Sequence, residues 1–212
     1  MTNEKRTLEA TDTELRFDEA DGKIVGYAAV FNSLSSPIGG QFRERILPGA
    51  FKNIRGDDDI ISAVNHDDSK VLGRKSAGNL ELTVTKKGLR YKITPPDTSY
   101  VRDLVENIKA GNVQGSSFEF RVREGGDGWV DNDGEMIREL RSIDVFEVGP
   151  VTRPAYDTTD VGMRSLEAWR SEQEVEVEVE AEPETETVPI PDETPVEVLR
   201  QKLKLTEQNG LG

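Results

Sequence analysis

Apolar and polar residues alternate in short runs along the first 170 residues, which is the period of β-strands. Turn residues separate these runs, which cover residues 23–32, 59–65, 80–85, 89–93, 117–123, 128–130 and 136–148. Hairpin turns between two runs are predicted at two places, the segment Thr85-Lys86-Lys87-Gly88 and the segment Asn132-Asp133-Gly134. Short strands at this spacing predict a mainly β fold, either a barrel or a sandwich.

A helical period replaces the alternation in one clear place. Val101, Leu104, Val105 and Ile108 recur at helical spacing, with capping residues at 97–99 and a glycine at 111. The pattern predicts a helix that packs one face on the strands. A second, shorter helix is predicted over residues 48–54, where a proline stands at the start. The fold class is therefore α+β, mainly β with flanking helices.

The pattern changes again near residue 171. Residues 171–212 contain 12 acidic and three basic side chains, and glutamates alternate with valines before a proline-rich stretch. Like charges along one face oppose strand pairing, and low hydrophobicity with high charge favours disorder. We expect two regions, a folded domain over residues 1–170 and a mostly disordered acidic tail over 171–212. A short helix over residues 194–208 is the one element expected in this tail.

The composition narrows the classes of function. The chain has 41 acidic residues, 27 basic residues and a formal charge of −14, with no basic cluster to grip phosphates, so a nucleic-acid partner is not expected. It has no cysteine, and the first residues lack the apolar core of a signal peptide. The sequence contains no run of about 18 apolar residues, so a membrane span is not expected. We expect a soluble protein of a reducing compartment.

No sequence motif indicates a site for a metal or a cofactor. With one histidine, centres with two or three histidine ligands are excluded. The acidic stretches at 57–59 and 127–135 lack the ligand spacing of a calcium loop, and no phosphate-binding glycine motif occurs. We therefore expect neither a metal nor a cofactor. His66 is the only ordinary side chain that titrates near neutral pH.

Three places combine reactive groups with strand ends. His66 follows an apolar run, and Ser117 lies in a run whose alternation turns it away from Phe118. Asp144 and Glu147 lie within a third run, and a carboxylate from it could orient the histidine. In a regular strand these two carboxylates point to opposite faces, so only one can serve, and periodicity does not choose between them. A structural role for each of these residues is the alternative at this point.

Seven segments in order along residues 22–160 resemble the prohead, or capsid maturation, serine proteases of tailed bacteriophages. They are GYAAVFN at 26–32, E-x-I-x-PGAF at 44–51, NHD at 65–67, LGR at 72–74, PDT at 96–98, SF at 117–118 and EVGPVTRPAY at 147–156. Each segment alone is weak, but their ordered succession is specific. The resemblance implies a closed or partly open β-barrel of the type found in the herpesvirus assembly proteases, with flanking helices.

The resemblance also implies roles for individual residues. Ser117 of the SF segment would be the nucleophile, His66 of the NHD segment the general base and Glu147 the third member. Asp144 is the alternative acid, and a serine–histidine dyad is the alternative if neither carboxylate serves. Arg153, in the last segment, is a candidate contributor to oxyanion stabilisation.

The implied function is a serine endopeptidase that acts during procapsid maturation. Its partners would be the major capsid protein, whose scaffold-like N-terminal segment it would cleave, and the protease itself as a second substrate, with self-association left open. It would act in the host cytoplasm, inside the procapsid. The alternative is a non-catalytic assembly or scaffolding module with the same fold.

Overall fold

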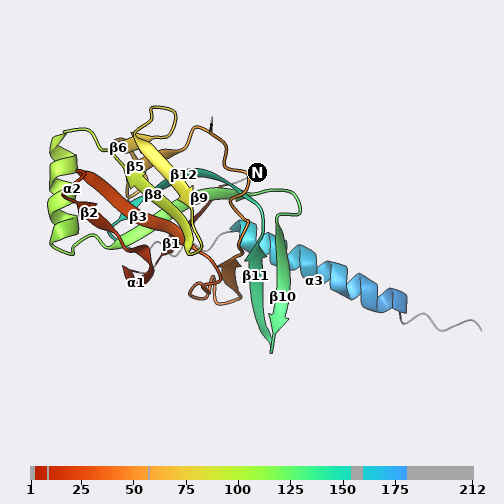
Figure 1. The fold of residues 1–212 in the computed structure, drawn as a ribbon. Helices are drawn as coiled ribbons and strands as arrows, with labels where there is room; N and C mark the ends of the chain where they lie inside the picture. Colours follow the sequence, from red (N-terminus) through yellow and green to blue (C-terminus); the bar gives the residue numbers. More distant parts are fainter. Residues whose placement is uncertain (1–2, 9, 57, 154–159, 181–212) are drawn as a thin grey trace, which may run out of the picture. The chain divides into compact units, whose positions relative to one another are not determined.

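The computed structural model describes residues 3–8, 10–56, 58–153 and 160–180 (Figure 1). The chain forms two units, residues 1–172 and 173–212, and all strands of the described residues lie in the first. The short helix expected over residues 194–208 lies outside the described residues.

Twelve strands and three helices occur in the described residues. The strands are β1 (Glu4–Leu8), β2 (Arg16–Asp18), β3 (Lys23–Val30), β4 (Arg43–Ile46), β5 (Ile61–Val64), β6 (Asp67–Arg74), β7 (Leu80–Val84), β8 (Gly88–Ile93), β9 (Gly115–Val122), β10 (Asp127–Asn132), β11 (Glu135–Leu140) and β12 (Ile143–Val151). The helices are α1 (Ala10–Thr13), α2 (Ser99–Lys109) and α3 (Asp160–Glu180). All the expected strand runs are confirmed, and the run over residues 136–148 is two strands.

The strands fall into three open sheets, so the described residues form no closed barrel. The sheets have the orders β1-β9-β12-β5-β6, β10-β11-β4 and β2-β3-β8-β7. Most neighbours are antiparallel, but β12 pairs with β5 and β11 with β4 in parallel. The mainly β, α+β expectation is confirmed, whereas closure is not observed because β1 and β6 remain edge strands of the five-stranded sheet.

The main core cluster contains buried residues of both the five-stranded and the four-stranded sheet. Phe118 and Phe120 of β9 stack at 4.9 Å between ring centroids and are fully buried. Tyr91 of β8 lies in the same core, and its hydroxyl is 2.7 Å from the Oγ atom of Ser116. Alternation along β9 therefore places Ser116 with the aromatic residues and Ser117 on the opposite face.

The helix expectations have different outcomes. Helix α2 buries the four apolar residues expected of it, begins after Thr98 and ends before Gly111, which has a φ of +74°. The second helix expected, over residues 48–54, is wrong, because this segment consists of turns. Gly49 has a φ of +98°, outside the helical region, and this conformation interrupts any continuous helix there.

Helix α3 runs past the expected boundary of the folded domain. Its backbone is helical to Glu180, so residues 171–180 form a helix where a disordered tail was expected. Glutamate has a high helix propensity, and the valine alternation that resembled a strand did not prevent a helix. None of the helices in the described part of the chain is both long and apolar enough to cross a membrane.

Candidate active site

His66 lies in the two-residue turn between β5 and β6. Val64 pairs with Asp67 across this hairpin, and Asn65 and His66 have φ values of +55° and +58°. Two successive positive φ angles are what a type I′ hairpin turn requires, and Asn and His adopt them more readily than most residues. The turn, rather than strand alternation, therefore sets the direction of the imidazole.

Asn65 fastens this turn to the end of β12. Its Oδ1 atom accepts a hydrogen bond of 2.7 Å from the backbone N–H of Thr152, and its Nδ2 atom lies 3.2 Å from Thr152 Oγ1. Its own backbone N–H donates to the carbonyl of Pro150 at 3.1 Å. Three contacts on one side chain and its backbone hold His66 in place beside the sheet.

Ser117 is the third residue of β9 and lies between two neighbouring strands. It is paired with Gly149 of β12 on one side and with Thr7 of β1 on the other, and it has no exposed surface. Its Oγ atom is 2.7 Å from Nε2 of His66. The structure thus brings together the two residues that the sequence placed 51 positions apart.

Glu147 completes the contact chain on the other side of the imidazole. Its Oε1 atom lies 3.1 Å from Nδ1 of His66, and its side chain is only 7% exposed. Asp144, the alternative acid, is instead held by Arg123, with Nε and Nη2 at 2.8 and 2.5 Å from its Oδ1 atom. Of the two carboxylates considered from the sequence, Glu147 is the one beside the histidine.

A β-bulge at Phe146 explains how Glu147 comes to the face of Ser117 and His66. Val145 pairs with Phe120, but Glu147 pairs with Glu119, so Phe146 is an extra residue in β12. An extra residue reverses the alternation beyond it, and Asp144 and Glu147 therefore share one face of the sheet. The expectation that they point to opposite faces is wrong, because it assumed a regular strand.

The geometry corresponds to a serine, histidine and carboxylate in consecutive contact, which is the arrangement that activates a hydroxyl for attack on a carbonyl. A family model described as the caudovirus prohead serine protease matches residues 11–172. The chain belongs to this family. The comparisons with curated proteins and with solved structures gave no match. Membership assigns the chain to capsid maturation in tailed phages, and its family acts in the prohead together with capsid proteins.

A second carboxylate lies close to the same histidine. Ligand atoms of His66, Glu119 and Glu147 lie within 4.8 Å of one another, which is the kind of cluster that can hold a divalent cation. Glu119 also contacts the N-terminal segment, through Asn3 Nδ2 at 2.6 Å and Lys5 Nζ at 3.5 Å. A cation bound here would be coordinated by one imidazole nitrogen of His66, either the one that faces Glu147 or the one that faces Ser117.

The N-terminal strand reaches the serine of this prohead protease from the side opposite to β12. Strand β1 precedes the segment matched by the family model, and the sequence did not predict it. The hydroxyl of Ser117 donates to the carbonyl oxygen of Arg6 at 2.8 Å. A hydroxyl has one proton, so it cannot donate to Arg6 and to His66 at once. Docked β1 thus competes with the histidine for the proton that catalysis would transfer.

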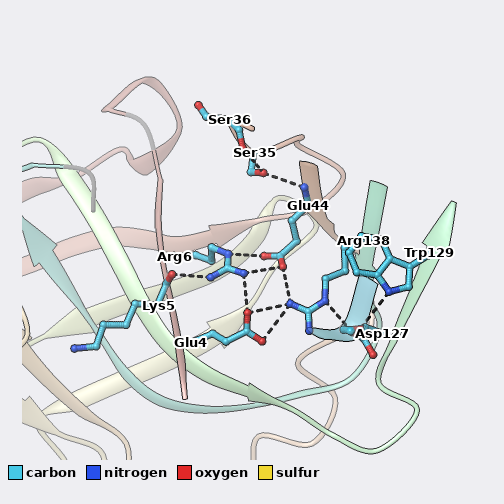
Figure 2. A network of polar contacts seen from close by, with 10 residues as sticks. Glu4, Lys5, Arg6, Ser35, Ser36, Glu44, Asp127, Trp129 and Arg138 are labelled. Carbon is cyan, nitrogen blue, oxygen red and sulfur yellow. Dashed lines mark hydrogen bonds and ion pairs between the residues drawn. The ribbon is translucent and has the colours of Figure 1, made fainter. Parts of the chain in front are cut away.

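The side chains of β1 enter a buried charge network that the sequence also did not indicate as one site (Figure 2). Two glutamates and two arginines alternate around a ring of ion pairs. Arg6 pairs with Glu4 and with Glu44 of β4, and Arg138 of β11 pairs with the same two glutamates. Burial raises the pKa of Glu4, but Arg138 and Arg6 outweigh it and hold the pKa below its ordinary value. No local pattern marks Arg138 as a member of this network, because its run over residues 136–148 also contains other charged residues, among them Glu139 and Arg141.

Arg153 lies at the end of the described part of this segment. It is exposed and follows Thr152, the residue anchored to Asn65. This places it next in sequence to the anchor of the histidine turn. Its role in oxyanion stabilisation stays a prediction.

Proposed function

We propose that this chain is the serine endopeptidase that cleaves the scaffold-like N-terminal segment of the major capsid protein, and itself, inside the procapsid in the host cytoplasm. The observation that carries the proposal is the run of contacts from Ser117 Oγ to His66 Nε2 at 2.7 Å and from His66 Nδ1 to Glu147 Oε1 at 3.1 Å. Residues 1–170 would be the protease domain and 171–212 an acidic tail. Kinship with the herpesvirus assembly proteases is part of the proposal.

The first half of the reaction forms an acyl-enzyme. Ser117 Oγ attacks the carbonyl carbon of the peptide bond while its proton moves to His66 Nε2. Glu147 stabilises the resulting imidazolium through Nδ1. When the tetrahedral intermediate collapses, the C–N bond breaks and His66 returns the proton to the leaving amine nitrogen.

The second half restores the enzyme. His66 accepts a proton from a water molecule, whose oxygen forms a new bond to the acyl carbon. The C–O bond to Ser117 then breaks, and His66 returns the proton to the serine oxygen. Backbone N–H groups would stabilise the oxyanion of both intermediates, with Arg153 as a candidate contributor.

The support for self-cleavage is the position of β1. The carbonyl oxygen of Arg6 accepts a hydrogen bond of 2.8 Å from Ser117 Oγ, so a peptide bond of the chain itself lies beside the nucleophile. The carbonyl group would have to turn its carbon toward Oγ before attack. The strand is the edge of its sheet, and its departure would leave the pairing of β9 with β12 intact.

The test is co-expression of the chain with its cognate capsid protein, followed by intact mass measurement of both. The wild type should shorten the capsid protein, whereas Ser117→Ala and His66→Ala should each reduce turnover by roughly 10⁴ or more and leave it whole. Ser116→Ala is the matched control, because Ser116 Oγ contacts Tyr91 in the core, and it should retain cleavage. Unchanged masses with normal shell assembly would favour the non-catalytic scaffolding module instead.

A further inference from the structure

Strand β1 lies along β9 in the way that an extended peptide substrate would. It is antiparallel to β9, with Thr7 opposite Ser117 and Arg6 opposite Phe118. The carbonyl oxygen of Arg6 accepts the hydrogen bond of Ser117 Oγ, so the peptide bond after Arg6 is the one that lies beside the nucleophile. Attack on it would require this carbonyl group to turn its carbon toward Oγ, which would make Arg6 the acylated residue. The contacts of β1 therefore indicate which side chains the site accepts on each side of the serine.

We propose that the protease selects a strand with an acidic residue two positions before a basic one, and that it cleaves after the basic residue. Glu44 would select the basic side chain and Arg138 the acidic one. This specificity rests on the proposed endopeptidase function.

The position of Arg6 is the most strongly defined. Its Nε and Nη2 atoms lie 2.8 and 2.9 Å from the two carboxylate oxygens of Glu44, a bidentate pair that matches the planar guanidinium. The guanidinium also lies 5.4 Å from the centre of the Phe120 ring. The side chain of Glu44 is 3% exposed, so an entering side chain without a positive charge would leave a buried carboxylate poorly compensated.

The acidic position depends on Arg138. Glu4 accepts hydrogen bonds of 3.2 and 2.9 Å from Arg138 Nη1, and both side chains are 1% exposed. Arg138 is held from behind by Asp127, whose Oδ2 atom lies 2.7 Å from Nε. The guanidinium is thus already oriented by the protein, and the strand supplies the remaining carboxylate.

Lys5, between Glu4 and Arg6, occupies a position at which the site should show little selectivity. Lys5 points to the face of Ser117, where its Nζ atom lies 3.5 Å from Glu119. Its side chain is 36% exposed and that of Glu119 20%, so solvent screens this pair. Selectivity should therefore be strong for the basic residue, intermediate for the acidic residue and weak between them.

The protein does not completely fill the space beside β1. A cavity of about 160 Å³ runs beside β1 and is lined by Lys5–Leu8, residues 33–39 and Glu44. Glu44 and Arg138 belong to β4 and β11 rather than to β1, so they stay in place when β1 leaves. An incoming strand then meets one buried negative and one buried positive charge in fixed order.

Binding tests the inference without any turnover. The variant is the full chain with Ser117→Ala, Glu4→Ala and Arg6→Ala. It keeps the recognition residues Glu44 and Arg138, but its own β1 binds them less tightly. It is titrated with fluorescent peptides of residues 3–8 (NEKRTL). Replacing the arginine of the peptide by glutamine should raise Kd by roughly 30-fold or more. Replacing its glutamate by glutamine should raise Kd less, and replacing its lysine by glutamine, the matched control, should change it by less than about threefold.

Glu44→Gln in the same background should remove the preference for arginine over glutamine. Circular dichroism shows whether that variant folds; if it does not, the peptide series on the parent chain decides alone. Equal affinities of the arginine and glutamine peptides, or no measurable binding of any peptide, would overturn the inference.

Cleavage separates this inference from the proposed function. The wild-type chain should cut longer peptides of the same pattern after arginine or lysine. A strong preference in binding with no cleavage of any peptide would uphold the recognition of the strand and overturn only the endopeptidase. Cleavage at bonds that do not follow a basic residue would overturn the specificity and leave the endopeptidase standing.

Discussion

Asp144 and Glu147 lie on the same face of β12, because the bulge at Phe146 adds one residue between them. Only Glu147 lies beside His66, at 3.1 Å, while Asp144 pairs with Arg123 and its side chain is 38% exposed. The two carboxylates are three positions apart and differ in their partners, so they can be tested against each other.

Glu147→Gln should lower kcat for capsid-protein cleavage by at least about tenfold, because the amide no longer stabilises the imidazolium. Asp144→Asn should leave kcat within about twofold, since it loses only an exposed pair with Arg123. Timed cleavage assays on both variants provide the measurement. If neither change slows the reaction tenfold, a serine–histidine dyad is the better description.

Asn65→Ala should destabilise the fold by roughly 1–2 kcal/mol, because alanine is strained at a φ of +55°. It also loses the two side-chain contacts with Thr152. Asn65→Gly is the matched variant, because glycine tolerates the conformation but makes neither contact. Urea unfolding of the two variants separates these effects, and equal losses in both would show that the turn conformation contributes little.

Glu4 should stabilise the protein at neutral pH and cease to do so in acid. The pKa of Glu4 is held below its ordinary value in the folded protein. Its stabilising contribution is therefore complete above the unfolded carboxyl pKa of about 4.3 and is lost as the pH falls through the folded pKa. At pH 7, Glu4→Gln should cost roughly 1.5–3 kcal/mol. Unfolding curves of wild type and variant should approach each other as the pH falls below about 4.3 and through the folded pKa of Glu4. A difference that does not shrink as the pH falls would contradict the electrostatic explanation.

Self-cleavage, if it follows the contacts of β1, should remove the segment up to Arg6. The product of the wild type would begin at Thr7, the residue paired with Ser117, and the Ser117→Ala chain would stay whole. Arg6→Gln should suppress this cut, whereas Lys5→Gln should not, because only Arg6 is paired with buried Glu44. Intact mass of the purified chains gives the answer, and a first cut elsewhere would show that β1 is not the preferred internal substrate.

The acidic tail provides a further check on the same specificity. Residues 171–212 contain no acidic residue two positions before a lysine or arginine. We therefore expect the tail to remain on the chain after self-cleavage, as shown by a C-terminal peptide in the digest. Early loss of this tail through the chain's own activity would argue against the acid–any–basic pattern.

The sequence alone determined the local elements and the identity of the reactive groups. Alternation located the strands of β3, β8 and β9, and helical spacing located α2, because each pattern follows from which side of one element is buried. Having a single histidine made His66 the natural base, and the ordered motifs indicated Ser117 and Glu147 as its partners. These are properties of individual residues and their near neighbours.

The tertiary structure decided how these groups are combined. The bulge at Phe146 brought Glu147 to the face of Ser117, and a turn with two positive φ angles aimed His66 at Ser117. Strand β1 and the ring of Glu4, Arg6, Glu44 and Arg138 lie in segments up to 134 residues apart. Local pattern carries no record of register shifts or of pairing between distant strands, because both depend on long-range contacts that form only when the sheets pack.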